Sequence, residues 1–202
     1  MDQWRRHEPP ARGGRVNVLV VSTFLAILVV VAIGGVALTL AFSAMDRARL
    51  LPGLMEGVSA VVRPAVLWLA FLVVLTATLG SLYFSEVAGF TPCVLCWYQR
   101  IAMYPLVVLL GLAAVRGDPT IRRYAGPIAG IGALVSLYHV GVERLPGLPT
   151  GSCSVTVPCD LVWFERFGFI TLPVMALAGF VAVLTLLFAY AGSGPPREES
   201  SA

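Results

Sequence analysis

The sequence predicts an all-α membrane protein, a four-helix transmembrane bundle plus one additional N-terminal transmembrane helix. Of the 202 residues, 58% are hydrophobic and only 12% are charged, a balance that excludes an ordinary soluble domain. A spanning helix needs about 20 predominantly apolar residues. Five long stretches carry no charged residue, and four of them meet or nearly meet that length alone. These stretches cover residues 16–45, 64–83, 101–115, 124–142 and 167–191.

The first 63 residues precede the predicted bundle. Residues 1–15 are polar, contain four Arg and a Pro-Pro pair, and are expected to form a disordered tail. Residues 16–45 are predicted to be the additional transmembrane helix. They resemble a signal peptide near residues 41–43, but the apolar run is too long for one. Residues 46–63 are expected to form a linker.

Residues 64–191 are expected to fold as one compact unit of four helices. The third apolar stretch is long enough to span a membrane only if its helix begins near Pro92. A polar turn with three Arg and a longer loop rich in Pro and Gly separate the later helices. The helices are predicted near 64–84, 92–115, 124–142 and 167–191, the Arg-rich turn at 116–123, the external loop at 143–166, and a disordered tail at 192–202.

The arginines indicate the orientation in the membrane. All 14 basic residues are Arg, and positive residues are enriched in cytoplasmic loops. The turn at 116–123 is therefore predicted to lie inside the cell. Both cysteine-bearing segments are then predicted to lie outside, where disulfides persist, in a multi-pass protein of the plasma or inner membrane.

The additional helix conflicts with this orientation. If residues 16–45 span the membrane, the four Arg of residues 1–15 lie outside, against the rule. Three explanations are compatible with the sequence. The helix inserts against its charge bias, it does not fully span the membrane, or translation starts at Met45 or Met55.

The first two of the four cysteines open the second bundle helix. Thr91 is a good N-cap and Pro92 fits the first helical position. Cys93 is then expected at the second position, with Cys96 on the same face. The exposed N–H groups and the helix dipole would stabilise a thiolate there. A redox-active dithiol is favoured over two buried structural cysteines because a second pair and Arg100 accompany it.

An arginine within a membrane helix is energetically costly, and Arg100 lies one turn after Cys96. Snorkelling to lipid headgroups is one interpretation. Stabilising negative charge on a quinone headgroup is the other, and the adjacent thiols favour it. His139, near the outer end of the third bundle helix, is a second candidate to face such a ligand. The nearby aromatic residues are expected to form an interfacial belt: Trp97, Tyr98 and Tyr104.

Cys153 and Cys159 lie in the external loop and are separated by five intervening residues. A disulfide that closes so short a loop stabilises the fold by only about 2 kcal/mol or less. Exchange chemistry is therefore favoured over a purely structural disulfide. A zinc site built from all four thiolates is compatible with the spacing, but an oxidising exterior disfavours it, and no metal is predicted.

The chain resembles the DsbB family of disulfide-bond formation proteins, in the shorter form also called BdbC-like. The resemblance covers roughly residues 64–191. It rests on the Pro-Cys-Val-Leu-Cys-Trp-Tyr-Gln-Arg run at 92–100, the external cysteine pair, Tyr138-His139, and the stretch 167–173. It implies a membrane bundle that reoxidises a DsbA-like thioredoxin-fold partner and passes the electrons to a quinone, either ubiquinone or menaquinone.

The resemblance also implies roles for individual residues. Cys153 would form the mixed disulfide with the partner, and Cys159 would exchange with Cys93. Cys96 would be the thiolate that meets the quinone, and Arg100 would hold the quinone. The additional helix and the short spacing of the loop pair depart from the family pattern, and they leave the order of Cys153 and Cys159 open.

Two other functions are compatible with the sequence. Electrons could flow in the reverse direction, carrying reducing power outward, because thiol spacing does not set direction. The protein could also be a non-enzymatic membrane adaptor with structural disulfides. No basic patch with interleaved aromatics indicates a nucleic-acid partner.

Overall fold

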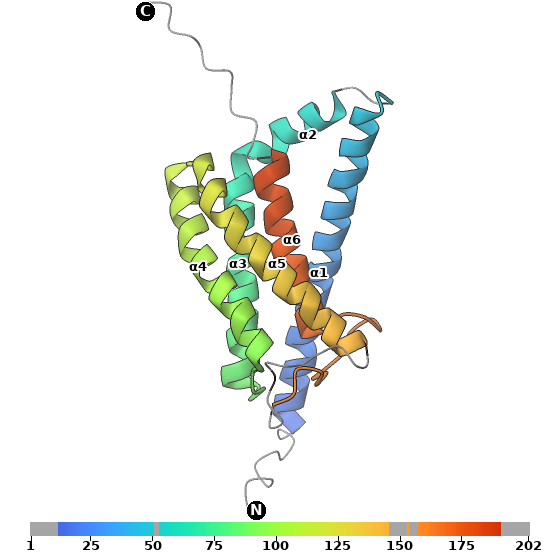
Figure 1. The fold of residues 1–202 in the computed structure, drawn as a ribbon, viewed down its shortest axis with the longest axis vertical. Helices are drawn as coiled ribbons and strands as arrows, with labels where there is room; N and C mark the ends of the chain where they lie inside the picture. The colour runs from blue at the N-terminus through green and yellow to red at the C-terminus, as the bar shows by residue number, and fades with distance from the viewer. Residues whose placement is uncertain (1–11, 51–52, 146–152, 154–156, 191–202) are drawn as a thin grey trace, which may run out of the picture.

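The computed structural model describes residues 12–50, 53–145, 153 and 157–190. Within these residues the chain forms helices and connecting loops and no β-strand (Figure 1). Five of the described helical segments are long and apolar enough to cross a membrane. The predicted all-α membrane fold is therefore confirmed. The predicted disorder of residues 1–11 and of 192–202 lies outside the described residues.

The helical elements follow one another closely along the chain. Several short 3-10 or π segments continue directly from, or into, an α-helix. The elements are α1 (Arg12–Arg47), α2 (Leu54–Val62), η2 (Arg63–Ala65), α3 (Val66–Leu82), η3 (Tyr83–Val87), α4 (Val94–Arg116), η4 (Pro119–Ile121), α5 (Arg122–Arg144), α6 (Leu172–Thr185) and η5 (Leu186–Tyr190).

Three boundaries differ from the sequence expectations. α1 begins at Arg12, inside the segment expected to be disordered, and the expected linker contains α2. The last bundle helix begins at Leu172, later than predicted. Phe167 and Gly168 have φ angles of 53° and 76°, and a helix cannot run through such left-handed residues. They form a tight turn whose flanks are paired by backbone hydrogen bonds, and the helix then starts at Leu172 with Pro173 in its first turn.

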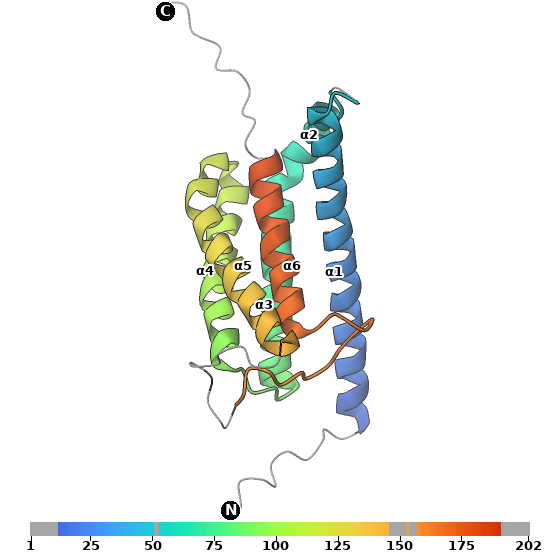
Figure 2. The same ribbon diagram turned by 45° about the vertical axis from the view of Figure 1, so that its right-hand side comes forward.

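Consecutive helices α3, α4, α5 and α6 run in alternating directions and pack side by side, while α1 lies outside them against α6 (Figures 1 and 2). The core between the four inner helices is aliphatic and aromatic. Its largest fully buried side chains include Val74, Leu106, Leu110, Phe180 and Leu187. Because α4 starts where α5 ends and α6 begins, Cys93 and His139 are brought to the same end of the bundle.

Small residues let α5 approach the last helical segment closely. A methyl group at Gly132 would collide with the Phe180 ring, and one at Gly126 would lie 2.8 Å from Phe188. Small residues at helix contacts are the usual means of close packing in membrane proteins. These two positions therefore fix how α5 crosses α6 and η5.

α1 is attached to the bundle near both of its ends. At the end that carries the cysteines, Arg166 Nε donates to Ser22 Oγ at 2.9 Å. At the other end, the hydroxyls of Thr39 and Tyr190 are 2.8 Å apart. Between them, Ala26 and Val29 pack with Ala178 and Ile170 in a small buried cluster. α1 thus runs in the same direction as α6.

Candidate redox site

Cys93 is the N-cap of α4. The prediction that Thr91 caps this helix and that Cys93 is its second residue is wrong, because Cys93 has an extended backbone and α4 starts at Val94. The Cys93 sulfur accepts a hydrogen bond from the backbone N–H of Cys96 at 3.3 Å. This is the bond that an N-cap side chain normally makes to the third residue of a helix. The cap therefore holds the Cys93 sulfur over the first turn.

The two α4 cysteines are a dithiol in this structure. Their sulfur atoms are 2.9 Å apart, which is hydrogen-bond distance and longer than the roughly 2.05 Å of a disulfide. Hydrogen bonding from the Cys96 thiol, and to a lesser extent from His139, lowers the pKa of Cys93, although burial opposes the shift. Cys93 is therefore the better thiolate of the two at neutral pH.

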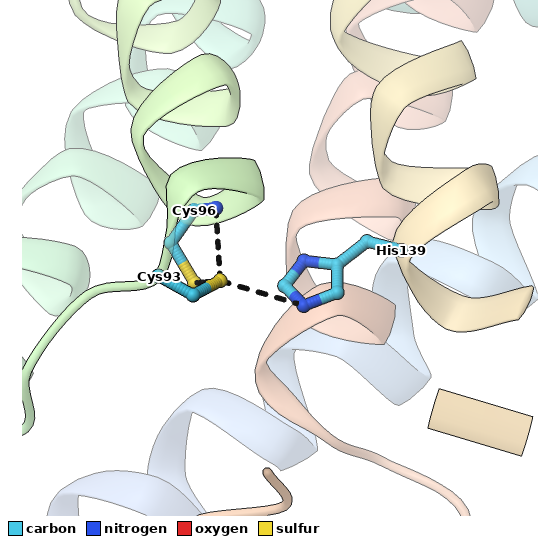
Figure 3. Close-up of side chains that lie close together, drawn as sticks. All are labelled: Cys93, Cys96 and His139. Atoms are coloured by element: carbon cyan, nitrogen blue, oxygen red, sulfur yellow. Dashed lines mark hydrogen bonds between the residues drawn. The ribbon is translucent and has the colours of Figure 1, made fainter. Parts of the chain in front are cut away.

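His139 on α5 faces this dithiol (Figure 3). Its Nε2 atom lies 3.7 Å from Cys93 Sγ and 3.0 Å from the carbonyl oxygen of Cys159. A carbonyl can only accept, so Nε2 must carry a hydrogen. In a neutral imidazole Nδ1 is then an acceptor, and Gln99 Nε2 lies 3.3 Å from it. The side chain is 2% exposed.

Gln99 is a site residue to which the sequence analysis gave no role. It is buried, it fixes the tautomer of His139 from one side, and it borders the main cavity on the other. Its position one turn after Cys96 could have suggested a shared face with the dithiol. Its partner on α5 is 40 residues away, and nothing local in the sequence indicates that contact.

Cys153 and Cys159 form a disulfide, with Cα atoms 5.8 Å apart. Together with Val142 and Leu95, all four cysteines belong to one apolar cluster at the end of the bundle. Cys159 is 2% exposed, whereas Cys153 is half-buried. The structure therefore brings the predicted cysteine pairs together, with the two sulfurs of the loop pair unequally accessible.

Arg100 is held by the neighbouring helix α3. Its Nε donates to Ser81 Oγ at 2.9 Å and its Nη2 donates to the Ser81 carbonyl at 3.1 Å. The guanidinium also lies 5.3 Å from the centre of the Trp97 ring. Ser81 was not identified from the sequence, because it lies 19 residues from Arg100 on a different helix. These contacts fix the guanidinium instead of leaving it free to extend toward headgroups.

Cys96, Gln99 and Arg100 border a cavity of about 740 Å³. Arg100 is the one charged residue among the described residues that line it, and most of the remaining lining is aliphatic or aromatic. The size suits a small-molecule ligand, and one cation in an apolar wall suits a quinone carbonyl. His139 is not one of the described residues that line this cavity. It lies on the other side of the dithiol, next to Cys93.

A group of stacked rings covers the cysteine end of the cavity. Phe90 stacks on Trp163 with ring centres 4.5 Å apart and on Phe84 at 5.6 Å. All three rings line the cavity, so its wall at this end is aromatic. Of the predicted belt residues, Trp97 and Tyr98 are about half exposed, whereas Tyr104 borders the cavity.

The dithiol and His139 also have the chemistry of metal ligands. One ligand atom from each of Cys93, Cys96 and His139 lies within 4.8 Å of the other two. Two sulfurs and an imidazole nitrogen are compatible with zinc. The loop disulfide leaves no four-thiolate set, and a disulfide between Cys93 and Cys96 would remove two of the three ligands.

Comparison with known proteins agrees with this arrangement. The sequence profile of the family described as "Disulfide bond formation protein DsbB" matches residues 63–157. A "Probable disulfide formation protein C 1" of Bacillus cereus is 50% identical over 113 residues, which cover 55% of this chain and 81% of that protein. "Disulfide bond formation protein C" of Bacillus subtilis is 44% identical over 126 residues, covering 62% of this chain and 91% of that protein.

No solved structure matches the chain. The matched segment contains α3, α4, α5 and the first loop cysteine, and the relatives are covered over most of their length. Their names agree with the paired thiols and with the membrane-spanning helices found here. The chain is a multi-pass membrane protein of disulfide bond formation, and it belongs to the DsbB family.

Proposed function

We propose that the protein is a thiol:quinone oxidoreductase that reoxidises a thioredoxin-fold partner outside the cytoplasm. One observation carries the proposal. The α4 dithiol has Cys96 at the wall of a large apolar cavity with Arg100, while Cys93 lies in one cluster with the loop disulfide. The dithiol therefore lies between a route to protein thiols and a cavity suited to a lipid-soluble oxidant.

The partner is expected to react first at Cys153. A thiolate of the reduced partner attacks the more accessible Cys153 sulfur and breaks its bond to Cys159, which leaves as the thiolate. The second partner thiol then attacks the mixed disulfide. The partner departs with a disulfide, and Cys153 and Cys159 hold the two electrons as a dithiol. The burial of Cys159 supports this order.

The loop dithiol then reduces a disulfide between Cys93 and Cys96. Cys159 attacks Cys93, and Cys153 resolves the resulting bond, so the loop disulfide re-forms and two electrons reach the α4 pair. His139 assists because its Nε2–H faces both the Cys93 sulfur and the Cys159 backbone.

Arg100, Gln99 and Cys96 are the residues that would contact a quinone in the cavity. A bound quinone supplies an acceptor for two electrons and two protons. The Arg100 guanidinium, fixed by Ser81, would stabilise negative charge at the ligand carbonyl. The mostly apolar walls lower the local dielectric constant and so strengthen that interaction. His139 is assigned to the thiols instead, because it faces Cys93 and is not among the residues that line the cavity.

The orientation is part of the proposal. Both cysteine pairs lie at the end of the bundle opposite the Arg-rich turn between α4 and α5. The positive-inside rule then supports an extracytoplasmic redox centre. Thiol alkylation of intact cells with a membrane-impermeant reagent tests this. Labelling of Cys153 in a Cys159→Ser variant is expected, and labelling only after lysis would contradict the orientation.

Turnover of the purified protein tests the function. The full chain in lipid nanodiscs is supplied with a quinone and a reduced thioredoxin-fold protein, and loss of partner thiols is followed together with quinone reduction. We expect stoichiometric loss of both, abolished in Cys96→Ser. A wild-type rate no higher than that of Cys96→Ser would reject the proposal. The potentials of the two cysteine pairs, measured in the same preparation, decide between this direction and the reverse.

A further inference from the structure

We propose that α1 forms the outer wall of a membrane-length channel that binds the hydrocarbon tail of the lipid-soluble acceptor. This inference rests on the proposed function and gives the additional helix a role in it. α1 lies outside residues 63–157, which the family profile matches, so nothing in the family match assigns this role.

α1 lines the cavity along much of its length. Its contribution extends from Leu25 to Phe42 and includes Leu28, Ala32, Gly35 and Thr39. The opposite wall comes from α3, α6 and η5. Without α1 this side of the cavity would lie open to the bilayer. The outer wall of the redox cavity is therefore supplied by an element outside the four-helix bundle.

The cavity is elongated along the membrane normal. Lining residues occur on the last span from Leu172 to Tyr190, both of which border the cavity. At 1.5 Å per residue this corresponds to roughly 27 Å, close to the thickness of a bilayer's hydrocarbon core. A compact headgroup would fill only a small part of such a length. The dimensions suit a headgroup that carries a long chain.

The polarity of the cavity gives that ligand a direction. Cys96, Gln99 and Arg100 lie at the cysteine end, next to Ser81. Most side chains beyond them are aliphatic, and the lining at the far end includes Phe42 and Tyr190. A ligand with one polar end and one long apolar chain matches this pattern. The polar end next to Cys96 identifies it as the electron acceptor and not a bystander phospholipid.

α1 is held at a defined place by side-chain contacts with the bundle. Leu25 approaches α3 so closely that a Cβ atom at Gly80 would lie 2.8 Å from Leu25 Cδ1. Hydrogen bonds fix Ser22 to Arg166 and Thr39 to Tyr190 on either side of the channel. Toward α2, α1 separates from α6 (Figure 1), and the cavity lies along this region. Buried polar contacts of this kind set the position of a membrane helix.

Two matched substitutions on α1 test the channel. Ala32 lines the cavity, whereas Ala37 on the same helix is exposed and is not among its lining residues. Ala32→Trp fills the channel and Ala37→Trp does not. Gly35 and Gly34 give a second pair, because a Cβ at either meets nothing within 4 Å but only Gly35 lines the cavity. Gly35→Leu is compared with Gly34→Leu.

The readout is the steady-state reduction of two quinones, one with a long isoprenoid tail and one with no tail. We expect Ala32→Trp and Gly35→Leu to raise KM for the long-tailed quinone by about tenfold or more, and to leave kcat/KM for the tailless one within about twofold. Ala37→Trp and Gly34→Leu should match the wild type with both. Lipid extracted from the purified wild type should contain quinone, and Ala32→Trp should lose it.

The outcomes separate the two proposals. If the wild type reduces neither quinone, the proposed function fails. If it reduces both but each lining variant behaves like its control, the function stands and the channel is wrong. Phospholipid as the sole extracted lipid, or equal loss of both quinone activities in the lining variants, would also overturn the channel.

Discussion

The Nε2 atom of His139 lies 3.0 Å from the carbonyl oxygen of Cys159 and 3.7 Å from the sulfur of Cys93. One imidazole on α5 therefore contacts both cysteine pairs, which come from the start of α4 and from the external loop. The contact to the loop is through the backbone, so it does not depend on the redox state of Cys159. His139 can hold the two pairs in register throughout a cycle of exchange.

Replacing His139 should raise the pKa of Cys93. The pKa of Cys93 is lowered chiefly by the Cys96 thiol, with a further contribution from His139, so the thiolate is present above the lowered pKa and is lost as the pH falls through it. His139→Ala should move this transition to higher pH, and His139→Gln, which keeps an N–H donor, should restore part of the shift. The thiolate ultraviolet absorbance of a Cys153→Ser, Cys159→Ser background reports it. Identical titrations of all three proteins would contradict the assignment.

Arg100→Lys should weaken acceptor binding while leaving thiol exchange intact. Lysine lacks the planar fork that donates to both Ser81 and a ligand, and a hydrogen bond to a charged group contributes about 1.5–3 kcal/mol. We expect KM for the quinone to rise roughly 10- to 100-fold, and Ser81→Ala to cause a smaller rise. The control is Arg144→Lys, since Arg144 pairs with Glu165 away from the cavity lining. Equal effects at both arginines would remove Arg100 from the binding site.

Removing the loop disulfide should affect activity far more than stability. The Cys153–Cys159 bond closes a loop with a sequence separation of 6, so its contribution to the free energy of unfolding is about 2 kcal/mol or less. The Cys153→Ser, Cys159→Ser variant should therefore unfold only slightly earlier in a denaturant or thermal titration in nanodiscs, yet show no oxidation of the partner. A large loss of stability with retained turnover would instead indicate a structural disulfide.

Gly132→Ala should destabilise the bundle, whereas Gly130→Ala should not. A Cβ at Gly132 collides with the fully buried Phe180, and overpacking of this kind typically costs about 1–3 kcal/mol. A Cβ at Gly130, on the same helix, meets nothing within 4 Å. Alanine there is expected to stabilise α5 slightly, by about 0.5–1 kcal/mol. Unfolding of the two variants under identical conditions provides the comparison, and equal stability would show that α5 and α6 can separate without cost.

The sequence was sufficient to predict the five apolar helices, the alternation of the last four and the two cysteine pairs. Their hydropathy and the Cys-x-x-Cys spacing are local properties. The contacts of Arg100 with Ser81 and of His139 with Gln99 were not predictable, because each joins two helices whose relative rotation is set by packing. The start of α4 was misplaced because the Cys93 side chain, and not Thr91, caps the helix.

The position of α1 beside the cavity was also not predictable from the sequence. The helix is apolar on all sides, so its sequence does not indicate which face contacts the bundle or the cavity. Ser22 and Thr39 are the buried polar residues that orient it, and their partners lie 144 and 151 residues away. Only the folded arrangement shows that one side of α1 borders the same space as Cys96.

The shared direction of α1 and α6 has a consequence for the whole chain. The start of α1 and the end of the last span lie at opposite ends of the bundle (Figure 2), and an odd number of spans, five among the described residues, places them on opposite faces of the bilayer. An epitope placed ahead of α1 and another placed behind η5 should thus never be reachable by one antibody treatment of sealed cells. A chain in which α1 merely rested on the surface would display both on a single side.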